Sequence, residues 1–222
     1  MARTMLPRTL VLDLDGTLVD SVPDLAAALN RLMAARGLPG FSHPEVTAMV
    51  GDGVAALVAR GFAARGQAPD DAALDAFIAD YGANAARATV AFPGVAETLR
   101  LLAGEGWRLA VCTNKPEAPA RSLLAALGLN GFFAAIGGGD SFPVRKPDPA
   151  HLLATLAAAG GAPARAVMVG DHHNDIAAAA GAGLPCIFAA WGYGNAALGT
   201  DAAAVAARFA DVPALAARLL RQ

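Results

Sequence analysis

The chain has little cysteine, little net charge and almost no lysine. Its 222 residues include two cysteines, Cys112 and Cys186, and both lie within apolar runs. This usage excludes a secreted disulfide framework and indicates a reducing compartment. A net charge of -2 provides no basic surface for nucleic acid. Only Lys115 and Lys146 among the 17 basic residues are lysines. Their placement indicates two sites that need the compact ammonium charge of lysine and not the planar guanidinium of arginine.

The segment 176–200 contains no charged residue and is as long as a membrane-spanning helix. The segment consists mostly of alanine and glycine and is interrupted by Gly181, Gly183 and Pro185, so a membrane-spanning helix is not expected. No uninterrupted apolar stretch precedes Asp13, and we expect no signal peptide and a cytoplasmic protein.

Two aspartates follow the first apolar run. Residues 11–17 read Val-Leu-Asp-Leu-Asp-Gly-Thr, with Asp13 and Asp15 two positions apart before a turn at Gly16. Side chains at i and i+2 of a strand share a face, so both carboxylates point the same way. Close like charges are costly, which indicates a divalent cation, a shared proton, or both. An ordinary polar turn after a buried strand uses the same residue types.

The same pattern recurs along the chain. Apolar segments over 109–112 and 166–169 lead into Thr113-Asn114-Lys115 and Gly170-Asp171, and 134–136 leads through a glycine run to Lys146. We expect strands at 9–14, 107–112, 133–137, 166–170 and 185–189, and helices at 94–104, 117–127, 149–159 and 175–181, the third of them capped by Asp148. This alternation predicts an α/β fold with a doubly wound parallel sheet. Ligands bind such sheets at the carboxyl ends of the strands, where these motifs lie.

Residues 22–88 interrupt the alternation. Their apolar side chains recur at helical spacing, with no convincing strand pattern. We therefore expect an α/β core formed by residues 1–21 and 89–222 and an inserted helical domain over 22–88. At its middle, Gly51-Asp52-Gly53 either starts a helix near a ligand or is an ordinary Asp-capped helix start.

Four separated motifs together resemble those of the haloacid dehalogenase superfamily of phosphatases. In order they are Asp13-Leu14-Asp15-Gly16-Thr17, Thr113-Asn114-Lys115, Lys146-Pro147 and Gly170-Asp171-His172-His173-Asn174-Asp175. The set is highly specific and covers nearly the whole chain. The resemblance implies a Rossmann-like core with the helical insert as its cap. Segments 49–54, 111–116 and 191–194 are most similar to phosphoglycolate phosphatases within the superfamily.

The resemblance implies hydrolysis of a phosphate monoester through an aspartyl-phosphate. Asp13 is then the nucleophile, and Asp15 is the general acid and base. The implied cofactor is Mg²⁺, which prefers oxygen ligands. Its implied ligands are the carboxylates of Asp13 and Asp171 and the backbone carbonyl of Asp15.

The resemblance also assigns roles around the phosphoryl group. Thr113 donates its hydroxyl to a phosphoryl oxygen, and Lys146 neutralises developing charge. Asp175 either supports the metal site from behind its ligands or holds Lys146. The expected substrate-binding residues are Thr17, Asn114, Lys115, Gly51, Asp52 and Gly53.

Two adjacent histidines, His172 and His173, also invite a metal interpretation. Neighbouring residues rarely aim at one point, and oxygen ligands already suffice for Mg²⁺. We expect both to be exposed loop residues, with Asn174 capping a helix that begins at Asp175. Phosphoglycolate phosphatases often have serine in place of His172, a difference that leaves the hydrolytic residues intact.

The expected partner is a small phosphorylated metabolite, with 2-phosphoglycolate as the leading substrate, and the chain acts as a monomer or homodimer. A phosphatase or mutase for a sugar phosphate shares every core residue and differs only in the insert. A dehalogenase of the same superfamily lacks the second aspartate, so Asp15 argues against it. A phospho-receiver signalling domain uses similar residues but is shorter and has no helical insert.

Overall fold

A parallel β-sheet forms the centre of the molecule. The computed structural model describes residues 6–221, and within them six strands pair in the order β5-β4-β1-β6-β7-β8. They are β1 (Thr9–Leu12), β4 (Arg108–Cys112), β5 (Ala135–Gly137), β6 (Ala166–Gly170), β7 (Cys186–Ala189) and β8 (Ala204–Ala206). Each neighbouring pair in this sheet is parallel. The predicted fold class is confirmed.

Helices cover both faces of the sheet because successive strand residues point to opposite sides. Leu10 and Leu12 pack in one apolar cluster with α5 (Val95–Gly104), α6 (Glu117–Ala126) and α9 (Val212–Leu219). Val11, between them, packs in a second cluster with α7 (Pro149–Ala158) and α8 (His173–Ala182). All three side chains are fully buried. The central strand is therefore held from both sides, and its end is fixed in place.

Element boundaries follow local signals. Helix α7 begins as predicted, since the Asp148 side chain accepts a hydrogen bond from the backbone N–H of Ala150 at 2.9 Å and Pro149 occupies the first turn. Strand β1 ends at Leu12, two residues earlier than predicted. The reason is a tight loop in which the carbonyl of Leu14 accepts from the backbone N–H groups of Leu18 and Val19. Strand β8 and helix α9 were not predicted.

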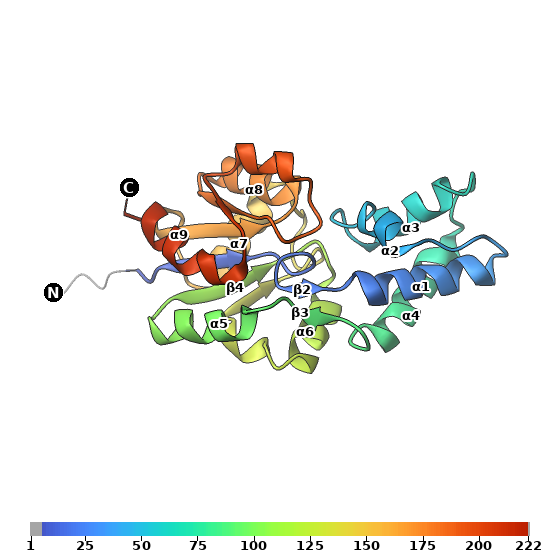
Figure 1. The fold of residues 1–222 in the computed structure, drawn as a ribbon, viewed down its shortest axis with the longest axis horizontal. Coiled ribbons are helices and arrows are strands. Elements are labelled where there is room, and N and C mark those ends of the chain that lie inside the picture. The colour runs from blue at the N-terminus through green and yellow to red at the C-terminus, as the bar shows by residue number, and fades with distance from the viewer. Residues whose placement is uncertain (1–5, 222) are drawn as a thin grey trace.

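Four helices between the first and second strands of the sheet form a separate helical insert. They are α1 (Val22–Ala35), α2 (His43–Thr47), α3 (Val54–Ala63) and α4 (Asp71–Asn84), with an apolar cluster of their own. The chain enters and leaves the insert through an antiparallel pair, β2 (Val19–Asp20) and β3 (Val90–Ala91). In Figure 1 the insert lies on the right of the sheet, and the chain termini lie on the left.

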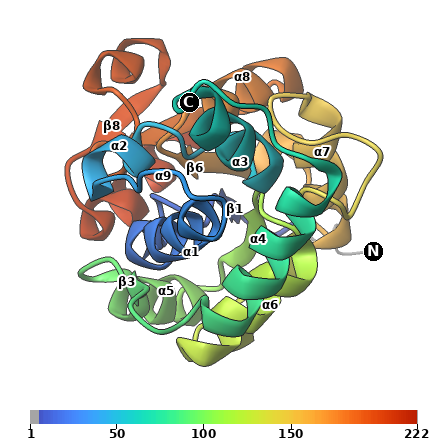
Figure 2. The ribbon, with the colours of Figure 1, turned by 90° about the vertical axis from the view of Figure 1, so that its right-hand side faces the viewer.

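The view from the insert shows α1, α3 and α4 in front of the sheet (Figure 2). Short 3-10 helices also occur within residues 6–221, namely η1 (Asn130–Phe132), η2 (Pro163–Arg165), η3 (Ala196–Asp201) and η4 (Phe209–Asp211). Among residues 6–221, no helix combines the length and the apolar character that crossing a membrane requires.

Candidate active site

Three neighbouring strands bring three of the four predicted motifs together at the carboxyl end of the sheet. Asp13 follows β1 and continues its pairing, because its backbone N–H donates to the carbonyl of Val169 at 2.9 Å. Thr113 follows β4, and its N–H donates to the carbonyl of Gly137 at 2.9 Å. Asp171 follows β6. Because β4, β1 and β6 are adjacent and parallel, these polar side chains meet at their carboxyl ends.

Lys146 lies between two carboxylates in the interior. Its Nζ is 2.9 Å from Oδ1 of Asp13 and 2.6 Å from Oδ1 of Asp175. Burial lowers the pKa of this lysine, but the charges of Asp13 and Asp175 outweigh burial and raise it above its usual value. His151 accepts a hydrogen bond from the Lys146 backbone N–H at 3.1 Å. Of the two roles expected for Asp175, the structure shows the contact with Lys146.

Asp13, Asp171 and Asp175 form a buried acidic cluster. One carboxylate oxygen from each lies within 4.8 Å of the others. Burial raises the pKa of Asp13 to about 6, with the charge of Asp175 adding to the effect and Lys146 opposing it. Burial and the charges of Asp13 and Asp175 raise the pKa of Asp171 to about 8. A hard divalent cation relieves this repulsion and takes oxygen ligands, so the donor set fits Mg²⁺.

Asp171 is also held tightly by its surroundings. Its Oδ1 accepts from the hydroxyl of Thr17 at 2.8 Å, and its Oδ2 accepts from the backbone N–H of Tyr193 at 2.8 Å. A Cβ on Gly16, which has φ +86°, would lie 2.3 Å from Asp171 Oδ2, and one on Gly194 would lie 1.7 Å from the Asp171 carbonyl oxygen. Thr17, expected to bind substrate, is thus placed against the carboxylate of Asp171. The contact with Tyr193 was missed by the sequence reasoning.

Asp15 turns away from the acidic cluster and pairs with Lys115. Lys115 Nζ lies 3.0 Å from each carboxylate oxygen of Asp15 and 4.6 Å from the ring centroid of Tyr81 in α4. Burial lowers the pKa of Lys115, and the charge of Asp15 more than reverses this, so the pKa lies above its usual value. The two motif aspartates therefore have different partners and separate environments. Nothing in the sequence spacing identifies the Asp15–Lys115 pair.

Two asparagines of the core bind the insert at Gly51. The Asn114 side chain donates to the carbonyl of Gly51 at 3.2 Å and to that of Lys146 at 3.0 Å. The Asn174 side chain donates to the same Gly51 carbonyl at 3.2 Å and to Oδ1 of Asp52 at 2.7 Å. The expected substrate-binding segment 51–53 is thus joined by three hydrogen bonds to asparagines at the carboxyl end of the sheet.

The start of α8 corrects two predictions. His172 is the N-cap, and the helix begins at His173, so Asn174 does not cap it. The physical reason is a capping box in which the Asp175 side chain accepts from the His172 backbone N–H at 3.0 Å. The helix therefore begins two residues earlier than expected. The two histidines are therefore not both exposed loop residues. His172 is the half-buried N-cap of α8, and His173 is exposed but lies in the first turn of the helix.

Asp52 does not cap α3 either, since Gly53 is the N-cap. Its Oδ2 pairs with Arg60, whose Nη1 also donates to the carbonyl of Met49 at 2.8 Å. Partial burial raises the pKa of Asp52, but the hydrogen bonds from Asn174 and Arg60 prevail and lower it. The interpretation of 51–53 as an ordinary Asp-capped helix start is therefore wrong.

A pocket that is partly open to solvent lies between this end of the sheet and the insert. Its polar wall comes from the core and its apolar wall from α1, α3 and the segment before α3. The lining residues are Asp13, Asp15, Leu25, Val50, Gly51, Gly53, Val54, Leu57, Thr113, Asn114 and Lys115. Both motif aspartates thus face one space between the core and the insert.

Known proteins resemble this chain in sequence and in overall fold. The model of the haloacid dehalogenase-like hydrolase family matches residues 7–183. A phosphoglycolate phosphatase from Caulobacter vibrioides is 44% identical over 96% of this chain and 92% of its own length. The crystal structure of a predicted phosphoglycolate phosphatase from Haemophilus somnus superposes with a TM-score of 0.87 at 31% identity, covering 96% of this chain and 99% of that one.

A further solved structure carries a ligand. A mutant of CbbY from Rhodobacter sphaeroides, in complex with xylulose-(1,5)bisphosphate, is 26% identical with a TM-score of 0.77 and covers 93% of this chain and 96% of that one. The chain belongs to the haloacid dehalogenase-like hydrolase family. Within that family it is an enzyme of the phosphoric monoester hydrolase class, as predicted.

Proposed function

We propose that this chain is a magnesium-dependent phosphomonoesterase that forms an aspartyl-phosphate on Asp13, with 2-phosphoglycolate as its leading substrate. The observation that carries the proposal is one pocket into which both Asp13 and Asp15 point, each with its own lysine. A nucleophile and a proton-transfer group need such separate environments. The relatives named phosphoglycolate phosphatase support the substrate.

The proposed metal ligands are the carboxylates of Asp13 and Asp171 and the backbone carbonyl of Asp15. When bound, Mg²⁺ supplies positive charge to the transferring phosphoryl group and offsets the repulsion within the acidic cluster. Thr17 and the backbone of Tyr193 orient Asp171 by the two hydrogen bonds described above. Lys146 contributes a second positive charge beside Asp13.

In the first half-reaction an oxygen of Asp13 attacks phosphorus while the ester P–O bond breaks, and Asp15 gives its proton to the departing alkoxide. In the second, water attacks phosphorus, the acyl phosphate P–O bond breaks, and Asp15 takes the proton of the water. Thr113 and Lys146 bind the phosphoryl oxygens. The net reaction consumes one water and returns Asp13 as a free carboxylate.

The contact between Asp15 and Lys115 must open during this cycle. In this structure Asp15 accepts from Lys115 on both oxygens. Protonation removes the negative charge that holds Lys115 and turns one of these oxygens into a donor. An incoming phosphate dianion offers Lys115 another partner, which frees Asp15 to act as the acid. Substrate binding and acid catalysis are linked in this way.

The substrate carboxylate requires a further cation, since Lys146 pairs with Asp13 and Asp175 and Lys115 is assigned to the phosphate. Arg145 is suitably placed, because its Nη1 would lie 3.6 Å from a Cβ built on Gly53, a pocket residue. Its guanidinium makes no hydrogen bond or ion pair within the described part of the chain, residues 6–221. We assign to it the recognition of the carboxylate of 2-phosphoglycolate.

The helical insert, predicted to span residues 22–88, is proposed to be the cap that closes over the pocket. Its closing contacts are the hydrogen bonds from Asn114 and Asn174 to Gly51 and Asp52. Closure excludes water during the first half-reaction and presents the apolar wall to the substrate. The antiparallel pair of β2 and β3 is the hinge about which the insert moves.

A panel of phosphorylated metabolites, ranked by kcat/KM with Mg²⁺, tests the proposal. The panel contains 2-phosphoglycolate, its analogue 2-hydroxyethyl phosphate, in which a hydroxymethyl group replaces the carboxylate, and sugar phosphates including xylulose-1,5-bisphosphate, which a CbbY mutant binds in its crystal structure. We expect 2-phosphoglycolate to exceed every other compound at least tenfold. If a sugar phosphate leads by that margin, the substrate assignment is wrong while the chemistry stands.

A further inference from the structure

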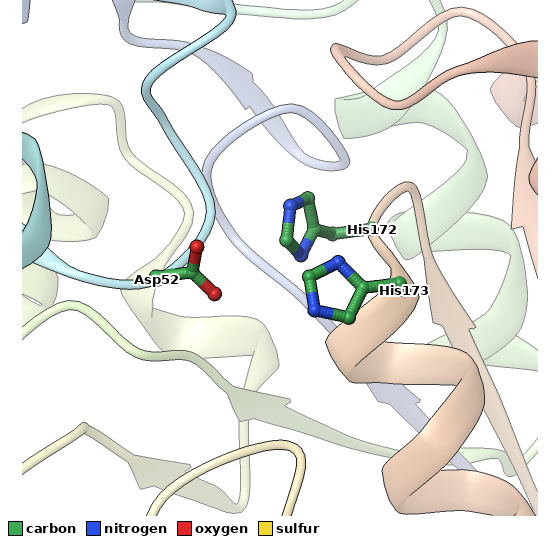
Figure 3. Close-up of side chains that lie close together, drawn as sticks. All are labelled: Asp52, His172 and His173. Carbon is green, nitrogen blue, oxygen red and sulfur yellow. The ribbon is translucent and has the colours of Figure 1, made fainter. Parts of the chain in front are cut away.

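A second cluster of potential metal ligands lies beside the active site. Asp52 of the insert faces His172 and His173 at the start of α8 in the core (Figure 3), and one ligand atom from each lies within 4.8 Å of the others. The two imidazole rings have centroids 4.1 Å apart at an angle of 47°. The proposed hydrolysis uses neither histidine. This cluster therefore needs an explanation of its own.

The donor atoms suit a transition metal rather than Mg²⁺. Two imidazoles and one carboxylate are a common ligand set for Zn²⁺, whose fourth position is then taken by water. Zinc ligands at about 2.0–2.2 Å from the ion lie roughly 3.3–3.5 Å apart. His173 is exposed and its side chain makes no hydrogen bond to residues 6–221, so its ring can rotate toward the other two ligand atoms.

Each of the three side chains keeps acceptor capacity. His172 Nδ1 accepts only a long contact, 3.5 Å, from the backbone N–H of Asn174. Asp52 accepts from Asn174 on Oδ1 and pairs with Arg60 on Oδ2. Because an ionised carboxylate has about four lone-pair sites, these two contacts leave Asp52 free to bind an ion.

We propose that Asp52, His172 and His173 form a Zn²⁺ site that bridges the helical insert and the core. Asp52 lies between Gly51 and Gly53, which line the pocket, and the histidines directly follow Asp171. An ion held by both sides adds a strong link where the asparagine hydrogen bonds already join them. Bound Zn²⁺ therefore holds the insert against the core and slows turnover. This consequence rests on the proposed function, whereas the binding itself does not.

Calorimetric titration of Zn²⁺ into the full chain tests the site. Saturating Mg²⁺ is present so that the acidic cluster is occupied by the ion it prefers. His173→Ala removes one ligand from an exposed position, and His43→Ala, also exposed and at the start of α2, is the matched control. We expect one Zn²⁺ per chain in wild type and in His43→Ala, and at least tenfold weaker binding in His173→Ala. Equal affinity in all three proteins would overturn the site.

Turnover under the same conditions tests the link to the insert. Zn²⁺ is expected to inhibit hydrolysis of 2-phosphoglycolate, with a midpoint at least tenfold higher in His173→Ala than in wild type or His43→Ala. Equal inhibition of all three would mean that Zn²⁺ acts at the acidic cluster, and would overturn the link. A wild type that fails to hydrolyse 2-phosphoglycolate would contradict the proposed substrate, and the calorimetric result would still decide the site.

Discussion

Replacing Asp171 by asparagine removes one titratable carboxyl group from the acidic cluster with little change in shape. The asparagine oxygen accepts from the Tyr193 backbone N–H, and its amide donates to the Thr17 hydroxyl, so both contacts of the native side chain have counterparts. The main physical change is therefore electrostatic. In the metal-free protein we expect Asp171→Asn to increase the free energy of unfolding.

The magnitude follows from the pKa of Asp171, raised from 3.8 to about 8 by burial and by the charges of Asp13 and Asp175. Between these pH values the folded state binds more protons than the unfolded state, so the free energy of unfolding falls as pH rises. The loss is about 1.4 kcal/mol per pH unit. It amounts to roughly 2 kcal/mol at pH 5 and about 4 kcal/mol at pH 7. Asparagine does not titrate and avoids this loss.

Urea unfolding of chelator-treated protein at pH 5, 6 and 7 measures the effect. Asp201→Asn, at an exposed aspartate, is the control and is expected to match wild type. The stability gain of Asp171→Asn over wild type should grow with pH, and added Mg²⁺ should stabilise wild type far more than the variant. A variant no more stable than wild type, with the same slope against pH, would refute the electrostatic reasoning.

Three further substitutions separate the roles of the other groups. Asp15→Asn should lower kcat by about 10²- to 10⁴-fold while Mg²⁺ affinity, measured by calorimetry, stays within a few fold; loss of Mg²⁺ binding would refute the assignment of its carbonyl. Lys146→Met should lower the free energy of unfolding at pH 7 by about 3–5 kcal/mol, because Asp13 and Asp175 lose their buried partner; an unchanged urea midpoint would contradict this. Arg145→Ala should lower kcat/KM for 2-phosphoglycolate by about 10- to 100-fold and leave 2-hydroxyethyl phosphate nearly unaffected; equal losses on both substrates would exclude carboxylate recognition.

The arrangement of the sheet could be predicted because each strand carries its own signal. Fully buried runs such as Leu10-Val11-Leu12 end in polar residues, and parallel pairing places those ends together. Asp148 before Pro149 marked the start of α7 correctly. Strand β8 escaped prediction because it has three residues and its Val205 is half exposed, which leaves no apolar run to recognise.

The partners of the site residues could not be predicted, since they depend on how segments meet in space. Lys115 and Asp15 are 100 positions apart, and Asn174 contacts Asp52 across 122. The start of α8 was misplaced because His172 caps it with a side chain that is not among the usual capping residues. Arg145 gave no sequence signal beyond its position next to Lys146, and its proximity to Gly53 is visible only in the folded chain.

Rapid quenching with ³²P-labelled substrate measures the proposed covalent step at Asp13 directly. Labelled 2-phosphoglycolate is mixed with enzyme and Mg²⁺, quenched in acid within milliseconds, and the protein-bound label is located by proteolysis. The expected result is label on the peptide that contains Asp13 in wild type and none in Asp13→Asn. Hydrolysis by wild type without any protein-bound label, or label that persists at normal yield in Asp13→Asn, would contradict it.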